Sequence, residues 1–344
     1  MNRIKAALQH PLVWPVLTLV LLVLLDLSQN AHFLSITVLD GHWFGAPVDI
    51  LNRAAPLVLV SLGMTLVIAT RGIDISVGAV VAIAGAAAAS ILADDPSRVS
   101  EALVAALAVG VLAGMWNGVL VAFGMQPIIA TLILMVAGRG VAQLLTGGQI
   151  IPIGTPGYLV VGGGYLARMP CSVWVAAGAI AATALLMNRT ALGMFIRAIG
   201  INPVATKLVG LRSSAIVFGV YTFSGLTAAI AGILISSNVR SADGNNAGLL
   251  LELDAILAVT LGGTSLLGGK FSLAGTVLGA LIIQTLTYTT YSIGVPPEAT
   301  LVVKAAVVLV VSVIQSATAR TVIMRQLKRA LPYALKKPLS EAAK

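Results

Sequence analysis

Few residues in this sequence have the types and spacing that chemistry requires. Gly268, Gly269 and Lys270 follow Gly263 and resemble a phosphate-binding loop, whose pattern is Gly, four residues, then Gly-Lys-Ser/Thr. Here the first glycine comes one position too early, and Phe271 replaces the hydroxyl that would bind magnesium. These residues also join two hydrophobic stretches, so we interpret them as a tight turn between helices.

Other catalytic and metal-binding patterns also lack their residues. Cys171 is the single cysteine, which excludes a disulfide framework, a cysteine-based zinc site and an iron–sulfur cluster. The histidines His10, His32 and His42 are too few and too N-terminal for a metal cluster deep in the chain. The sequence has no nucleophile elbow, HExxH motif or pair of carboxylates suited to hydrolysis. We therefore expect a chain that is not an enzyme and holds no metal or cofactor of its own.

Polar residues within apolar stretches are the remaining functional candidates, because they could line a pathway for a solute. Glu252 and Asp254 are two positions apart, so they point in different directions on a helix. They form either an outer cluster facing water or a partner, or a polar entrance for a hydroxyl-rich or cationic solute. Asn117 either bonds helices together or lines a wet path, since an unbonded amide in lipid is costly. Gln126 and Thr264 complete this set of pathway candidates, which is chosen on polarity and position.

Three other charges lie in or beside apolar stretches. Arg139 and Lys304 must face protein or water, and Lys304 could reach outward toward Glu298. Asp74 lies where a helix is expected to begin, and a carboxylate there complements the helix dipole. A role for Asp74 in the pathway is the alternative.

The segment from Asn188 to Arg212 is basic and long for a simple connection. It predicts a short helix around residues 202–209, because Asn202 can cap it and Pro203 suits its first position. Gly210 would then close that helix. A capped short helix between two hydrophobic stretches indicates a docking element rather than a solvated loop.

Composition places all of these residues in a membrane. The 344 residues are 58% hydrophobic and 10% charged, with a mean hydropathy of +1.01, whereas soluble domains carry roughly 25% charged residues. This excludes a cytosolic enzyme, a disordered chain and a nucleic-acid-binding protein, despite the net charge of +9. The 35 glycines and 5% aromatics suit helices that pack closely in lipid. We expect an all-α, polytopic membrane protein.

A helix needs about 20 apolar residues to cross the bilayer, and the sequence offers ten such stretches. They are residues 12–27, 54–70, 73–92, 102–124, 127–146, 171–188, 213–237, 253–269, 271–293 and 299–319. Gly110, Gly114 and Gly118 lie on one face of the fourth stretch, which predicts close packing with a neighbouring helix. The Gly- and Pro-rich residues 147–170 predict an outer loop.

The distribution of charge predicts which side each loop faces. With both termini in the cytoplasm, 15 of the 21 basic residues but only Asp74 and Glu341 of the 12 acidic residues lie inside, as the excess of Lys and Arg in cytoplasmic loops requires. We therefore expect one transmembrane domain over residues 1–344, with a basic cytoplasmic tail at 320–344. That tail would be attracted to anionic lipid headgroups.

Four stretches carry a resemblance to a known family. Residues 62–86 (LGMTLVIATRGIDISVGAVVAIAGA), 116–148, 190–211 (TALGMFIRAIGINPVATKLVGL) and 253–269 (LDAILAVTLGGTSLLGG) resemble the permease subunits of bacterial ABC-type sugar importers, in the ribose/galactose branch. Within that branch, residues 40–56, 130–144 and 245–259 are similar to the galactofuranose importers of enteric bacteria. The resemblance covers most of the chain from Ile50 to Ser316.

The resemblance implies a type II ABC importer-like permease in the bacterial inner membrane. Its partners would be cytoplasmic ATP-binding subunits, which hold ATP and Mg, a second permease subunit (the same chain or a sister chain) and a periplasmic sugar-binding protein. The loop at 189–212 would then hold the helix that couples the permease to the ATPase. The implied coupling residues are Arg197, Gly200, Asn202, Pro203, Ala205, Lys207 and Gly210.

The implied function is ATP-driven import of a monosaccharide, galactofuranose, from periplasm to cytoplasm. Ribose, another pentose or a different hexose is the nearest alternative cargo. An ion-coupled secondary transporter is a second class, but it would favour a carboxylate at the bilayer midplane, and the acids here lie at the ends of the apolar stretches. An intramembrane enzyme would need a nucleophile and a base together, and no such pair is present.

Overall fold

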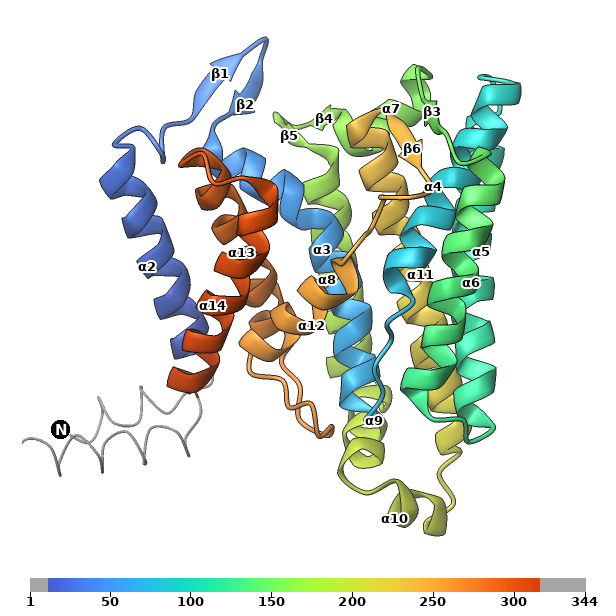
Figure 1. Ribbon diagram of the computed structural model, residues 1–344. Coiled ribbons are helices and arrows are strands. Elements are labelled where there is room, and N and C mark those ends of the chain that lie inside the picture. Colours follow the sequence, from blue (N-terminus) through green and yellow to red (C-terminus); the bar gives the residue numbers. More distant parts are fainter. Residues whose placement is uncertain (1–11, 316–344) are drawn as a thin grey trace, which may run out of the picture. The chain divides into compact units, whose positions relative to one another are not determined.

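The computed structural model describes residues 12–315, and these residues are mainly helical with three small two-stranded sheets (Figure 1). The chain forms two compact units, residues 1–289 and 290–344. The basic tail expected at 320–344 and both chain termini lie outside the described residues. So does the side chain of Glu298.

Most of the described chain belongs to helices. Their bounds are α2 Val13–Gln29, α3 Ala46–Ala69, α4 Val77–Asp94, α5 Val99–Ala122, α6 Pro127–Thr146, α7 Pro156–Gly163, α8 Cys171–Arg189, α9 Leu192–Ile201, α10 Pro203–Leu208, α11 Ser213–Val239, α12 Leu251–Leu261, α13 Leu273–Ser292 and α14 Pro297–Gln315. The strands are β1 Thr37–Leu39, β2 His42–Phe44, β3 Ile150–Pro152, β4 Tyr165–Leu166, β5 Met169–Pro170 and β6 Ser241–Asp243.

Within the described part of the chain, seven helices are long and apolar enough to cross a membrane: α3, α4, α5, α6, α8, α11 and α13. Each overlaps one of the ten expected stretches, and α6 has the expected bounds. The helix α2, at 17 residues, falls just below that length, and the described apolar part of α14, Ala299–Val310, is shorter still.

The expected stretch 253–269 is not a continuous helix. Its helix, α12, has 11 residues and so is about 16 Å long. It ends at Leu261 because Gly262 and Gly263 follow, and Gly263 takes a left-handed conformation (φ +83°). The residues between α12 and Leu273 form turns, so the stretch is apolar as expected but is not one continuous helix.

The helix α3 is longer than the sequence indicated. It begins at Ala46 rather than at residue 54, with Pro47 and Asp49 in its first turn, and Asp49 pairs with Arg53 one turn further on. Pro56 lies inside the helix.

The long helix α11 is the centre of the first unit, and it packs against α3, α4, α5 and α7. The glycines of the expected stripe on α5 confirm the predicted close packing. A Cβ atom at Gly114 would collide with the backbone carbonyl of Tyr221, and one at Gly118 would lie 2.8 Å from the carbonyl oxygen of Phe218. On the opposing helix, Gly225 faces the backbone of Gly110 in the same way.

This contact makes a direct prediction for stability. The Gly114→Ala variant should unfold at a lower temperature than the wild type, because overpacking against an unyielding backbone costs about 1–3 kcal/mol. Gly140→Ala on α6 is the matched control, since no atom lies within 4 Å of the added Cβ and alanine favours helix by about 0.5–1 kcal/mol. Thermal unfolding in detergent measures both. Equal melting temperatures for the two variants would show that the added methyl group at position 114 does not destabilise the packing of α5 against α11.

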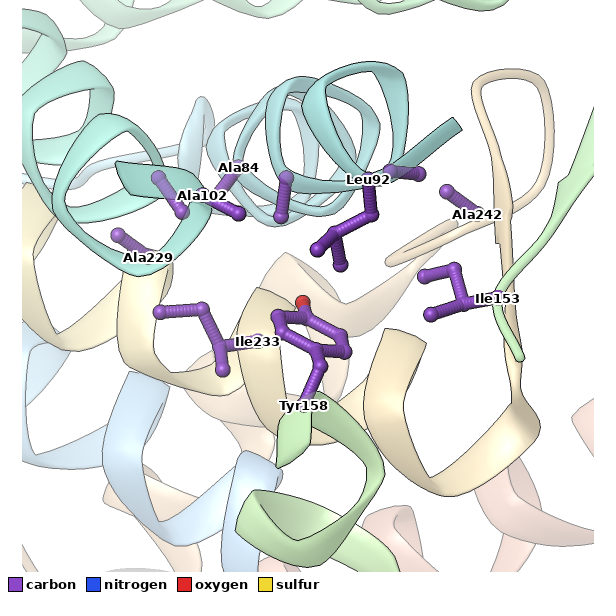
Figure 2. Packing of buried hydrophobic residues seen from close by; sticks show 11 residues of the cluster. Ala84, Leu92, Ala102, Ile153, Tyr158, Ala229, Ile233 and Ala242 are labelled. Carbon is purple, nitrogen blue, oxygen red and sulfur yellow. The ribbon is translucent and has the colours of Figure 1, made fainter. Parts of the chain in front are cut away.

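The two ends of the first unit differ (Figure 1). The β1–β2 hairpin, the other small sheets and α7 lie at one end, and α9 and α10 lie at the other. The expected outer loop at 147–170 is thus partly ordered as β3, α7, β4 and β5. Figure 2 shows how it is held: Tyr158 of α7 is buried among Ile153, Leu92 and Ile233, and its hydroxyl lies 2.7 Å from Ser236 Oγ of α11.

The second unit contains the last residues of α13 and the helix α14. Between the two helices the chain turns at Gly294, whose φ is +78°.

Candidate functional site: the α9–α10 element and its contacts

The short helix α10 confirms the local structure expected from the sequence. The Asn202 side chain accepts hydrogen bonds from the backbone N–H groups of Val204 (3.1 Å) and Ala205 (3.0 Å), and Pro203 occupies the first turn. Gly210, at φ +82°, follows the helix in the left-handed region. Asparagine, proline and glycine therefore define both ends of a six-residue helix that could not form alone.

The outer surface of α10 is apolar and exposed. Val204, Leu208 and Val209 are 67%, 83% and 82% exposed. Ala205 and Lys207 are exposed beside them. Large apolar side chains exposed together with a lysine typify a surface that another protein covers.

The helix α10 is also loosely packed underneath. Pro203 and Lys207 line a cavity of about 170 Å³, together with residues of α5 and α11 such as Val121 and Tyr221. The helix α10 is therefore not packed tightly against α5 and α11 on this side.

By contrast, α9 lies against the bundle. Ile196, Ile199 and Gly200 are buried. A Cβ atom at Gly200 would collide with the backbone of both Ala69 and Gly269, so this glycine serves close packing and presents no side chain to a partner. Arg197 is exposed and its guanidinium lies 4.8 Å from the centre of the Phe271 ring.

The turn that resembles a phosphate-binding loop takes part in this packing. Gly268 and Gly269 both have left-handed φ values (+84° and +85°), and Gly268 N–H donates to Ser265 at 3.0 Å. The N–H of Gly269 donates to the carbonyl of Ala69 at 2.9 Å. The residues form the tight turn that the sequence predicted, and that turn joins the end of α3.

Arg71, which no sequence motif indicated, completes the junction. Its Nε donates to the carbonyl of Gly200 at 2.6 Å and its Nη2 donates to the carbonyl of Ile201 at 2.7 Å. One guanidinium thus binds the last carbonyls of α9 from the chain segment after α3. The contact spans 129 positions in sequence, and the backbone of Arg71 takes a left-handed φ of +66°.

The pathway candidate Asn117 belongs to a buried hydrogen-bond network. Its Nδ2 donates to Ser76 Oγ at 2.8 Å, and Asp74 accepts from Ser76 Oγ (2.6 Å) and Ser224 Oγ (2.8 Å). Asp74 also accepts from the backbone N–H of Ser76 just before α4, which agrees with its expected role at a helix start. The network joins α4, α5 and α11, so the position of Asn117 favours the interpretation that it bonds helices together. Its Oδ1 and the nearby Tyr221 hydroxyl are buried without a partner among the described residues.

The other pathway candidates are not brought together. Glu252 is buried at the start of α12 beside Gly78, whereas Asp254 on the same helix is partly exposed. Thr264 is buried in the turn after α12, where its hydroxyl accepts from the N–H of Ser272 at 3.3 Å. Gln126 is exposed at the start of α6.

Arg139 faces protein, as its place in an apolar stretch requires. Its Nη1 donates to the carbonyl of Ala247 at 2.7 Å in the segment before α12. In that segment a hydrogen bond from the Asn246 side chain lowers the pKa of the Asp243 carboxyl. Among the described residues, no group of three or more His, Cys, Asp and Glu side chains could hold a metal ion.

Comparison with known proteins decides the family. The family described as branched-chain amino acid transport system, permease component, matches residues 46–312, from the first residue of α3 into α14. The chain belongs to this family of transport permeases. It is a multi-pass protein of the bacterial inner membrane, a transport subunit without an ATPase domain.

Several curated relatives are similar over most of their length. The chain is 52% identical to the galactofuranose transporter permease of Escherichia coli K12 over 314 residues, which are 91% of this chain and 92% of the relative. It is 40% identical to the fructose import permease of Bifidobacterium longum, over 92% of this chain and 90% of the relative. It is also 40% identical to the ribose import permease of Escherichia coli K12, over 76% of this chain and 82% of the relative. No solved structure matches the chain significantly.

Proposed function

We propose that this permease imports a monosaccharide, galactofuranose, from the periplasm to the cytoplasm, and that ATP hydrolysis in partner subunits drives it. The observation that carries this proposal is the 52% identity with a galactofuranose transporter permease across nearly the whole length of both chains. The other relatives above import fructose and ribose by name, so a second pentose or hexose is the alternative cargo.

The proposed topology has ten membrane segments and both termini in the cytoplasm. The charge distribution supports it, because the basic residues of α9, α10 and their flanks would then lie inside. The segment before α12 and the short helix α12 would together form the eighth crossing, which ends at the turn that contacts Ala69 and Gly200. The tail at 320–344 would bind anionic lipid headgroups.

The α9–α10 element, within residues 189–212, is the proposed contact with the ATP-binding subunits. Its exposed apolar face on α10 and its anchorage to the end of α3 and to the turn after α12 support this role. Closure of the ATPases around ATP and Mg would then pull α10, and the Arg71 junction would pass that pull to the bundle. A second permease subunit, identical or a sister chain, and a periplasmic sugar-binding protein would complete the importer.

Reconstitution tests this function. Proteoliposomes that contain the chain and its ATP-binding subunit should accumulate labelled galactofuranose. The ATP-binding subunit and ATP are inside the vesicles, and the sugar-loaded binding protein is outside. Labelled fructose and ribose measured in the same assay decide the alternative cargo. Accumulation of sugar without any ATPase, driven by a proton or sodium gradient, would instead establish a secondary transporter.

A further inference from the structure

A polar cavity of about 370 Å³ lies at the end of the first unit opposite α10. Its walls come from the start of α3, the end of α11 and the middle of α13. This volume is at the lower end of the roughly 300–1,000 Å³ typical of small-molecule sites. A sugar ring and a few water molecules would fill it.

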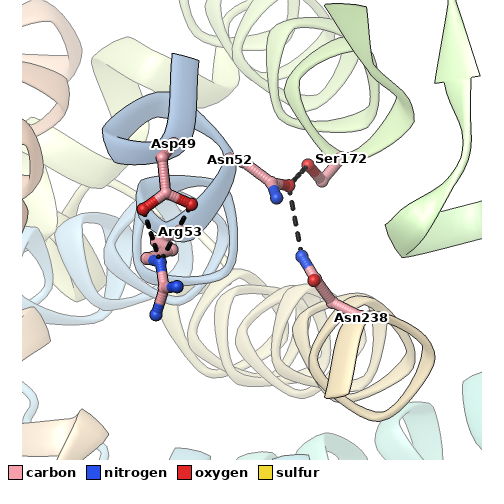
Figure 3. Close-up of polar contacts among 5 residues, drawn as sticks. All are labelled: Asp49, Asn52, Arg53, Ser172 and Asn238. Atoms are coloured by element: carbon pink, nitrogen blue, oxygen red, sulfur yellow. Dashed lines mark hydrogen bonds and ion pairs between the residues drawn. The ribbon is translucent and has the colours of Figure 1, made fainter. Parts of the chain in front are cut away.

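The charged groups of the cavity compensate each other. Arg53 Nε donates to both carboxylate oxygens of Asp49, at 2.9 and 3.0 Å (Figure 3). Among the described residues this pair engages only Nε of Arg53, so its two terminal nitrogens remain available as donors. The cavity as a whole therefore presents hydrogen-bonding groups without net charge, which suits a neutral ligand.

Amide side chains on facing helices supply the other hydrogen-bonding groups. Asn52 Oδ1 of α3 accepts from Ser172 Oγ of α8 and from Asn238 Nδ2 of α11, the latter at 3.2 Å (Figure 3). These two bonds fix the orientation of both amides and leave Asn52 Nδ2 as a donor and Asn238 Oδ1 as an acceptor. Gln284 of α13 adds a third amide to the lining.

The rest of the lining is aliphatic. Pro56, Leu234, Ile235 and Val239 can contact the C–H faces of a ring, and no aromatic side chain lines the cavity. Without an aromatic platform a sugar would gain no stacking energy, so it would bind weakly and be released readily. Weak binding is what a transport step needs.

We propose that this cavity is a binding site for a neutral monosaccharide on its way through the permease, with Asn52, Asn238 and Gln284 as its hydrogen-bonding residues. The assignment rests on the proposed function and gives it a site in place of the scattered candidates Asn117, Glu252 and Thr264. The cavity lies at the periplasmic end in the proposed topology, where sugar would arrive.

The first test uses the complete transporter in proteoliposomes. Asn238→Leu and Gln284→Leu preserve side-chain size but remove hydrogen bonding. Each should raise the KM for uptake, or lower the rate at subsaturating sugar, at least tenfold, while the amount of assembled complex and its ATP hydrolysis stay at the wild-type level. Asn245→Leu, an exposed amide outside the cavity, is the control and should transport within twofold of the wild type.

The second test detects occupancy directly. In a Cys171→Ala background, the Asn238→Cys variant should react with a charged maleimide at least threefold more slowly when galactose, which equilibrates with its furanose form, fructose or ribose is present. The Ala93→Cys variant, exposed at the same end on α4, should react at an unchanged rate. If the wild type transports sugar but the Leu variants match it and no sugar slows labelling, the cavity assignment is wrong and the proposed function stands. If the wild type transports none of these sugars, the proposed function fails.

Discussion

The Arg71→Met transporter is expected to hydrolyse ATP but to accumulate at least tenfold less sugar than the wild type. Arg71 binds the carbonyls of Gly200 and Ile201 with two charged hydrogen bonds of 2.6 and 2.7 Å. Each such bond contributes about 1.5–3 kcal/mol. Methionine keeps much of the apolar stem but lacks the Nε and Nη2 donors. Movement of α9 would then no longer be transmitted to the end of α3. ATP hydrolysis would then continue while its coupling to the bundle is lost.

Two further variants make this prediction specific. Arg71→Lys should recover part of the uptake, because an ammonium group can donate to one carbonyl but lacks the fork that reaches both. Arg168→Met removes an exposed charge between β4 and β5, at the end of the unit opposite α10, and should behave as the wild type. The measurements are ATP hydrolysis and sugar uptake in the same vesicles. If Arg71→Met retains the normal ratio of sugar moved to ATP hydrolysed, the junction does not transmit the motion.

The second large effect is expected on the outer face of α10. The double variant Val204→Asp with Leu208→Asp should reach the membrane in normal amounts, because these side chains are 67% and 83% exposed and contribute little to the fold. Binding of the ATP-binding subunit should weaken at least 100-fold, which is about 2.7 kcal/mol. Full burial of an aliphatic side chain is worth about 1.5–3 kcal/mol, and a carboxylate placed in the same contact adds a desolvation cost.

Val38→Asp is the control for this double variant. Val38 lies on the β1–β2 hairpin at the opposite end and is 56% exposed. It should leave association unchanged, as measured by co-purification and by titration of the ATP-binding subunit onto the permease in nanodiscs. If the double variant binds the ATPase as the wild type does, the docking surface lies elsewhere.

Local sequence chemistry predicted the structure well where the cause is local. Asn202, Pro203 and Gly210 define α10 through capping and backbone preferences, and these act within a few residues. The glycine stripe on α5 likewise predicted a close helix contact, because glycines spaced by four lie on one helix face. That prediction does not depend on which helix packs against them.

Prediction failed where distant residues decide the outcome. Hydropathy counts apolar residues but is insensitive to the two glycines after Leu261, so it extended the 11-residue α12 into a full span. Polarity selected Glu252 and Thr264 as pathway residues; the first is buried beside α4 and the second accepts a hydrogen bond within a turn, and their role in the pathway stays a prediction. The Arg71 fork and the cavity around Asn52 each depend on residues more than one hundred positions apart, and a single sequence contains no sign of such pairings.

The contact among Ala69, Gly200 and Gly269 has a consequence for how such transporters diversify. Here main chain meets main chain, with no side chain between them to be compressed or to change rotamer. The residues that α10 offers outward, such as Val204 and Leu208, take no part in this contact. Substitutions that adapt the outer face of α10 to a different ATP-binding subunit can therefore accumulate while the backbone contact behind it stays the same.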